Sequence, residues 1–215
     1  MMLFRSAAPS LAPIVLPLAV PAAKPSPAEA PGALRAIRLR SLGASDIEWL
    51  PALADLLVDG VHHGASLGFL APLSRYAALD FWRERLARLG ASERLWIASA
   101  RDEPGAPLLG AIELVLCEGA DAHHRGELRR LMVHSQQRGL GLASQLVCRA
   151  ECAALDAGRS LLVAHVQGGS QAEAVFAHLG WQCGGEIPDF SCCAEGRRHT
   201  GAVYYRRLSL GLAPK

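Results

Sequence analysis

The stretch LMVHSQQRGLGLASQL, from Leu131 to Leu146, constrains the fold of this chain more than any other feature. An apolar run gives way to polar residues and two glycines, and apolar residues of helical spacing follow at once. The residues that continue on one helical face are Leu142, Leu146, Ala150 and Ala153. This pattern predicts a buried strand, a tight turn and then a helix from Gly139 to about Ala157, which Gly158 ends.

A turn of this kind is a place where a phosphate group can dock. The first N–H groups of a helix have no partner inside the helix, and the helix dipole favours negative charge there. Gly139 and Gly141 allow a ligand to approach the backbone closely, and Arg138 stands beside them. We therefore expect an anion at this helix N-terminus. A dinucleotide fold is disfavoured, because Ser144 replaces the third glycine of GxGxxG and the turn comes late in the chain.

The remaining sequence predicts one domain of the α+β class. In chain order we expect strand, helix, helix, three strands, helix, strand, helix and two strands, without an internal repeat. The expected strands cover 35–42, 94–102, 108–119, 126–135, 159–167, 181–190 and 201–210, and the expected helices 46–60, 74–89, 139–157 and 170–180. The expected buried face of the first helix is formed by Ile47, Leu50, Leu53, Leu57 and Val61.

Charge and cysteine content exclude several functional classes. Lys and Arg total 22 against 20 Asp and Glu, a net charge of +2, so no nucleic-acid partner is expected. None of the six cysteines forms a CxxC pair and none of the eight histidines an HExxH motif, so we expect no metal site. Cys148 and Cys152 stand four apart on the predicted helix, where we expect two buried thiols. Free thiols are typical of a reduced, cytoplasmic protein.

The first 33 residues are rich in alanine and proline, and we expect them to form a disordered tail before a domain at 34–212. An export signal is the alternative, because Arg5 precedes an apolar stretch. Pro13 and Pro17 interrupt that stretch, and proline is unfavourable inside the helix that such a signal forms. The segment is also too short and too broken to span a membrane.

The segment ELRRLMVHSQQRGLGLASQL resembles motif A of the GNAT family of N-acetyltransferases. The family pattern Q/R-x-x-G-x-G/A falls on Gln136, Gly139 and Gly141, with Arg138 at the second variable position. The order of strands and helices from about Leu34 to Leu210 also agrees. The resemblance implies a mixed, mostly antiparallel central sheet with helices on both faces.

Further motifs are similar to the GNAT subgroup that contains the tabtoxin resistance acetyltransferase. They are HHGASLGFLAPL, ELRRLMV, GEIPDF and RRHTGAVYYRRL. Members of that subgroup acetylate an amine of a small molecule with acetyl-CoA. The resemblance implies that Met132 and Val133 pair through their backbone with the pantetheine arm. The backbone amides expected to cradle the pyrophosphate belong to Gln137, Arg138, Gly139, Leu140, Gly141, Leu142 and Ala143.

Glu127 and His165 are the candidate catalytic residues. Amine acetylation is helped by a general base, and by a backbone N–H, for which Val133 is the candidate, near the developing oxyanion. Glu127 lies at the position of the acidic residue of the relatives; alternatively it is an exposed carboxylate paired with Arg129 or Arg130. His165 ends an apolar row, where the relatives carry an aspartate, and it either assists as a base or simply packs.

Phe176 is a departure from the family pattern. Relatives carry a tyrosine there, positioned to protonate the departing thiolate, and phenylalanine cannot donate a proton. His178, Tyr204 and Tyr205 are near in sequence or on the adjacent final strand, but none stands at the same place. The change weakens the resemblance to the tabtoxin resistance enzymes more than it weakens acetyltransferase activity.

The loop GASLGF is the candidate substrate-binding segment, through Gly64, Ala65, Ser66 and Phe69, or else a plain connection between two helices. The favoured function is acetylation of a small-molecule primary amine by direct attack in a ternary complex. A non-catalytic acyl-CoA-binding module and a protein N-acetyltransferase are the alternatives. The family frequently forms homodimers, so the resemblance also allows a homodimer, which the sequence does not decide.

Overall fold

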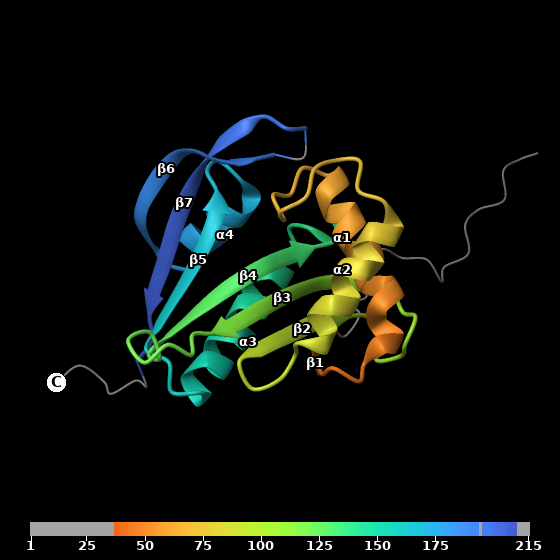
Figure 1. The fold of residues 1–215 in the computed structure, drawn as a ribbon, viewed down its shortest axis with the longest axis horizontal. Helices are drawn as coiled ribbons and strands as arrows, with labels where there is room; N and C mark the ends of the chain where they lie inside the picture. The colour runs from red at the N-terminus through yellow and green to blue at the C-terminus, as the bar shows by residue number, and fades with distance from the viewer. Residues whose placement is uncertain (1–36, 194, 210–215) are drawn as a thin grey trace, which may run out of the picture. The chain divides into compact units, whose positions relative to one another are not determined.

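The computed structural model of the protein describes residues 37–193 and 195–209, so the expected tail at 1–33 lies outside the described residues. Within them, seven strands form one sheet in the order β1-β2-β3-β4-β5-β7-β6, with helices on both of its faces (Figure 1). All neighbouring strands are antiparallel except β4 and β5, which are parallel. The α+β class and the predicted order of elements are confirmed.

The elements agree closely with the patterns that predicted them. The strands are β1 (Arg38–Leu42), β2 (Glu93–Ser99), β3 (Leu108–Leu116), β4 (Arg125–Val133), β5 (Leu161–Gln167), β6 (Gln182–Cys192) and β7 (Arg198–Arg207). The α-helices are α1 (Leu50–His62), α2 (Arg75–Ala87), α3 (Leu142–Asp156) and α4 (Gln171–His178). Short 3-10 turns occupy Ile47–Trp49 and Ser135–Gln137.

Two hydrophobic cores form, one on each face of the sheet. Alternate residues of a strand point to opposite faces, so Ile112 and Leu114 of β3 pack with α3, while Ala111 packs with α1 and α2. The predicted apolar stripe of α3 is confirmed, since Leu142, Leu146, Ala150 and Ala153 are all buried. The sheet therefore presents one face to α1 and α2 and the other to α3 and α4 (Figure 1).

Three local predictions were wrong. Ile47 is 63% exposed, because the chain forms a 3-10 turn there and α1 begins only at Leu50. Helix α3 begins at Leu142 rather than Gly139, because Gly139 and Gly141 both adopt the left-handed conformation, with φ of +79° and +74°. Cys148 and Cys152 are exposed on the outer face of α3 rather than buried.

Strand β4 carries a bulge and then separates from β5. Ala111 of β3 faces Met132 and Glu113 faces Arg129, so β4 has one extra residue between these two pairs. Arg130, in this interval, has a φ of +47°. Pairing with β5 covers only the first four residues of β4, from Arg125 to Leu128. Beyond that point no strand of the described residues pairs with this edge of β4, and the sheet opens.

The N-terminus of α2 offers a test of local stability. The hydroxyl of Ser74 accepts a hydrogen bond from the N–H of Ala77 at 3.1 Å. We expect Ser74→Ala to lower the free energy of unfolding by about 1 kcal/mol, because an N–H of the first turn loses its acceptor. For a domain of this size the melting temperature should fall by about 2–4 °C in calorimetry. Ser74→Asn, which keeps an acceptor, should melt close to the wild type; an equal loss in both variants would contradict the capping role.

Candidate active site

A pocket of about 180 Å³ lies beside the opening between β4 and β5, on the face that carries α1 and α2. It receives residues from three separate parts of the chain: the loop between α1 and α2, strand β4 and strand β5. Its lining residues are Ser66, Leu67, Glu127, Leu128, Arg129, Arg130 and His165. The fold thus brings both candidate catalytic residues and one residue of the predicted substrate loop to the same place.

Glu127 reaches this pocket from the first half of β4. It faces Val115 of β3 and lies alongside Val163 of β5, and its side chain is 24% exposed. One carboxylate oxygen, Oε2, is 2.5 Å from Nη2 of Arg129. Glu127 is therefore ion-paired with Arg129 in this structure, as the alternative interpretation of this residue expected. Hydrogen bonding to Glu127 raises the pKa of Arg129. For Glu127 to act as a base, the incoming amine must therefore displace the Arg129 guanidinium from its carboxylate.

His165 lies on β5 and lines the same pocket as Glu127, and it is exposed. Its imidazole stacks on Phe190 of β6, with 6.0 Å between ring centroids and 13° between the planes. The Phe190 ring in turn lies over Gly201 of β7, where an added Cβ would come within 2.5 Å of the ring. The motif GEIPDF contains Phe190, yet its contact with His165 could not be read from the motif because the two lie on different strands.

Arg130 is a pocket residue that the sequence indicated only as an ion-pair partner. Its guanidinium lies 4.9 Å from the ring centroid of Phe81 and contacts Glu113 at 2.5 Å. Glu113 is 3% exposed and also accepts a hydrogen bond from Arg85 at 3.0 Å. Burial lowers the pKa of Arg130, which the charge of Glu113 opposes. The pocket is therefore lined by two guanidinium groups, each already paired with a carboxylate.

The predicted cofactor turn follows β4 directly. At Gly139 and Gly141 an added Cβ would meet no atom of the described residues within 4 Å, so this side of the turn is open toward them. In the described chain, no backbone N–H from Arg138 to Ser144 donates a hydrogen bond to another residue. These free donors at the start of α3 suit a phosphate group. Gln137 differs from the expectation, because its N–H already donates to the carbonyl of His134 at 2.8 Å.

Met132 and Val133 form the end of β4 where the sheet has opened. They face Ala111 and Gly110 of β3 on one side, while β5 no longer pairs with them on the other. Met132 is buried and Val133 is half-buried. The unpaired edge leaves backbone N–H and C=O groups for an extended ligand, in agreement with the expected pantetheine contact.

Only one of the four predicted substrate-loop residues lines the pocket. Gly64 has a φ of +79°, and Ala65 donates its N–H to the carbonyl of Gly60 at 2.9 Å, so these two residues end α1. Phe69 packs edge-on against Phe81 of α2, at 5.1 Å between centroids. Ser66 is the member that reaches the pocket.

Phe176 is buried in the core that α3 and α4 share. It is 2% exposed and packs against Trp181 and Tyr204, at 4.8 and 6.4 Å between centroids. The hydroxyl of Tyr204 donates to Glu173 at 3.2 Å, and burial raises the pKa of this tyrosine. The position of the family tyrosine therefore carries an apolar packing residue here.

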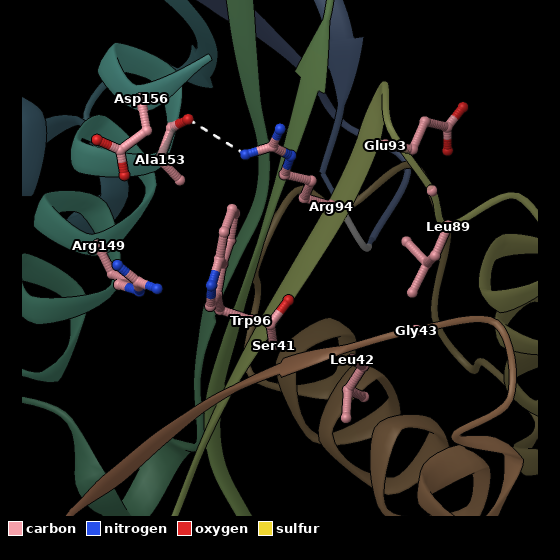
Figure 2. Close-up of a pocket in the computed structure, with 11 residues that line it drawn as sticks. Ser41, Leu42, Gly43, Leu89, Glu93, Arg94, Trp96, Arg149, Ala153 and Asp156 are labelled. Atoms are coloured by element: carbon pink, nitrogen blue, oxygen red, sulfur yellow. Dashed lines mark hydrogen bonds between the residues drawn. The ribbon is translucent and has the colours of Figure 1, made fainter.

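A second, larger hollow of about 350 Å³ lies between the later half of α3 and strands β1 and β2. Figure 2 shows Arg149 of α3 pointing toward Trp96 of β2, and Arg94 of β2 donating a hydrogen bond to the carbonyl of Ala153. None of the candidate catalytic, cofactor or substrate residues lines this hollow. We therefore place the candidate active site in the smaller pocket.

The family model described as "Acetyltransferase (GNAT) family" matches residues 59–181, which is more than half of the chain. The protein belongs to the GNAT acetyltransferase family. Enzymes of this family transfer an acetyl group from acetyl-CoA, and the match spans the last turn of α1, the open part of the sheet and the glycine turn before α3. The open amides of the turn fit the phosphates of such a donor, and this GNAT protein is accordingly an acyltransferase that uses acetyl-CoA.

Solved structures show the same fold at low sequence identity. A Salmonella typhimurium protein described as an acetyltransferase, determined with acetyl-CoA, is 18% identical with a TM-score of 0.61, covering 84% of this chain and 98% of the other. A protein described as a phosphinothricin N-acetyltransferase is 18% identical, with a TM-score of 0.61 and coverage of 80% and 99%. A ribosomal-protein-alanine N-acetyltransferase from Brucella melitensis is 19% identical, with a TM-score of 0.60 and coverage of 80% and 99%.

Across residues 37–193 and 195–209, no group of three or more His, Cys, Asp or Glu side chains is placed to hold a metal ion. No helix in the described part of the chain combines the length and the apolar character needed to cross a bilayer.

Proposed function

We propose that this GNAT acetyltransferase acetylates a primary amine of a small molecule by direct attack in a ternary complex. The observation that carries the proposal is the convergence of Ser66, Glu127 and His165 on one pocket. The volume of about 180 Å³ is smaller than the roughly 300–1,000 Å³ of sites for drug-sized ligands. A compact acceptor suits such a pocket better than a folded protein substrate.

In the proposed reaction the amine nitrogen attacks the acetyl carbonyl, so that a C–N bond forms and the C–S bond to coenzyme A breaks. The acceptor arrives as an ammonium ion, which can replace Arg129 as the partner of Glu127. Glu127 first removes one proton to give the neutral amine that attacks, and the N–H of Val133 donates to the developing oxyanion. The second proton of the nitrogen is lost to the departing thiolate or to solvent as the tetrahedral intermediate collapses. Holding both substrates in place supplies a large part of the rate enhancement.

His165 is the second candidate for the base, because it lines the same pocket as Glu127. No acid is required at Phe176 for the leaving group. A thiol has a pKa of about 8.5, so its thiolate can depart without a proton donor. The buried phenylalanine therefore does not stand against catalysis.

The pocket chemistry favours an acceptor that carries an anionic group near its amine. Once the ammonium group has taken its place at Glu127, Arg129 presents a free guanidinium group, which binds carboxylates and phosphoryl oxygens well, while Arg130 stays paired with Glu113. An amino-acid-like acceptor fits this charge arrangement and the resemblance to the tabtoxin resistance subgroup. The neighbour described as a phosphinothricin N-acetyltransferase agrees with such an acceptor, whereas the ribosomal-protein-alanine enzyme represents the peptide alternative.

The test is a coupled assay of thiol release from acetyl-CoA with a panel of acceptors. The panel should contain amino acids, polyamines, aminoglycosides and a peptide with an N-terminal alanine. We expect saturable release with small amines, and most efficiently with those that carry a carboxylate. Turnover of the peptide alone would favour the protein N-acetyltransferase, and acetyl-CoA binding without release on any amine would contradict the catalytic proposal.

A further inference from the structure

Asp59 connects α1 to the turn that precedes the acetyl-CoA cradle. Its Oδ2 accepts the N–H of Ser135 at 2.7 Å, and its Oδ1 accepts the hydroxyl of the same serine at 2.7 Å. The two residues are 76 positions apart in the sequence. The Asp59 side chain is only 13% exposed. Both hydrogen-bond donors of Ser135, its N–H and its hydroxyl, are therefore held by one well-shielded carboxylate.

The surroundings of Asp59 favour its charged form. His63 Nδ1 lies 3.2 Å and His134 Nε2 lies 3.9 Å from Oδ1. Burial acts to raise the pKa of Asp59, but the hydrogen bonds from Ser135 and the nearby histidines together hold it below its ordinary value. The carboxylate is therefore ionised at neutral pH, and hydrogen bonds to an ionised acceptor are stronger than those between neutral groups.

The same end of α1 also contacts the loop at residues 64–73, the acceptor loop, which contributes Ser66 and Leu67 to the candidate active-site pocket, the acceptor pocket. The backbone of Gly60 is in close contact with Leu67, since an added Cβ would come within 2.9 Å of Leu67 Cδ1. His62 Nε2 accepts the N–H of Leu73 at 3.2 Å, near the far end of this loop. The last turn of α1 thus contacts the cofactor turn through Asp59 and the acceptor loop through its neighbours.

We propose that Asp59 is a positioning residue that sets the start of the cofactor turn and links it, through the last turn of α1, to the acceptor loop. The proposal rests on the cofactor turn and acceptor pocket proposed above. Asp59 touches neither substrate in this scheme and acts through Ser135. Because coupling between two sites is reciprocal, acetyl-CoA bound at the turn should restrain the loop at residues 64–73.

Calorimetry of acetyl-CoA binding to Asp59→Asn tests the first part. Asparagine keeps the shape, but it removes the charge and turns an NH₂ group toward one of the two Ser135 donors. We expect the Kd for acetyl-CoA to rise about tenfold, the effect of losing a hydrogen bond to a charged acceptor. In turnover assays KM for acetyl-CoA should rise similarly, while kcat changes less than about threefold.

Asp55→Asn is the matched control. Asp55 lies one turn earlier on α1 and pairs with Arg75 at the surface, so its substitution changes the net charge equally. Its Kd for acetyl-CoA should equal that of the wild type. Ser135→Ala should weaken binding less than Asp59→Asn, and adding it to Asp59→Asn should cause no further loss. Equal Kd values for the Asp55 and Asp59 variants, or fully additive effects of Asp59 and Ser135, would overturn the proposal.

Hydrogen exchange of the 64–73 amides tests the link to the acceptor loop. Saturating acetyl-CoA should slow exchange there in the wild type and in Asp55→Asn, but much less in Asp59→Asn. A purely structural role would change the exchange of the free protein without removing the response to acetyl-CoA, and that result would overturn the link. If Asp59→Asn does not fold, acetyl-CoA calorimetry and hydrogen exchange are both measured on Ser135→Ala instead. Loss of binding in Gly141→Asp with normal behaviour of Asp59→Asn would reject only the positioning role.

Discussion

Gly141→Asp should nearly abolish acetyl-CoA binding while the fold persists. The side chain would point into the open side of the cofactor turn, where an added Cβ meets no protein atom within 4 Å. A carboxylate there repels phosphate oxygens and occupies the space that they need. We expect the Kd measured by calorimetry to rise on the order of 100-fold or more, which corresponds to roughly 3 kcal/mol.

Gly158→Asp provides the matched control for backbone strain. Gly158 follows the other end of α3, has a φ of +73° and is equally free of close neighbours. Each aspartate must enter the left-handed conformation, at a cost of about 1–2 kcal/mol, so both variants should lose similar stability. Only Gly141→Asp should lose acetyl-CoA binding. Gly141→Asn adds a side chain of similar size without the charge, so its Kd shows how much of the loss is due to charge. Wild-type affinity in Gly141→Asp would contradict the phosphate cradle.

Glu127→Gln should lower kcat on the order of 100-fold with nearly unchanged acetyl-CoA affinity. The amide keeps the shape of the side chain but cannot accept the proton, and general-base catalysis typically contributes about 10²–10⁴. Arg129→Gln is the control, because it removes the ion pair at Glu127 and leaves the base in place. Its turnover should exceed that of Glu127→Gln. Full turnover of Glu127→Gln would exclude this carboxylate as the base.

The pH–rate profile separates Glu127 from His165. A base must be deprotonated to act, so the rate rises with pH through its titration. If His165 is the base, the ascending limb of the profile should vanish in His165→Asn, whereas if Glu127 is the base the limb should vanish in Glu127→Gln. We expect His165→Asn to retain the limb and to lose less activity than Glu127→Gln. Loss of both limb and activity in His165→Asn would invert the assignment.

The elements of this fold and the glycine turn before α3 could be predicted because they depend on local patterns. The period of apolar residues sets strand or helix, and glycines at 139 and 141 permit the left-handed turn after β4. The errors also have local causes. The predicted helix at Ile47 included a 3-10 turn, and the start of α3 was placed too early because the spacing of apolar residues does not mark the first helical residue.

The sequence by itself determined the order of elements, the GNAT resemblance and the candidate residues, because each of these is written in neighbouring positions. Only the tertiary structure decided which candidates meet. Ser66, Glu127 and His165 share a pocket because β4 bulges and leaves β5, and Asp59 holds Ser135 because α1 packs across the end of β4. Such contacts depend on strand register and helix packing between distant segments, which no local spacing encodes.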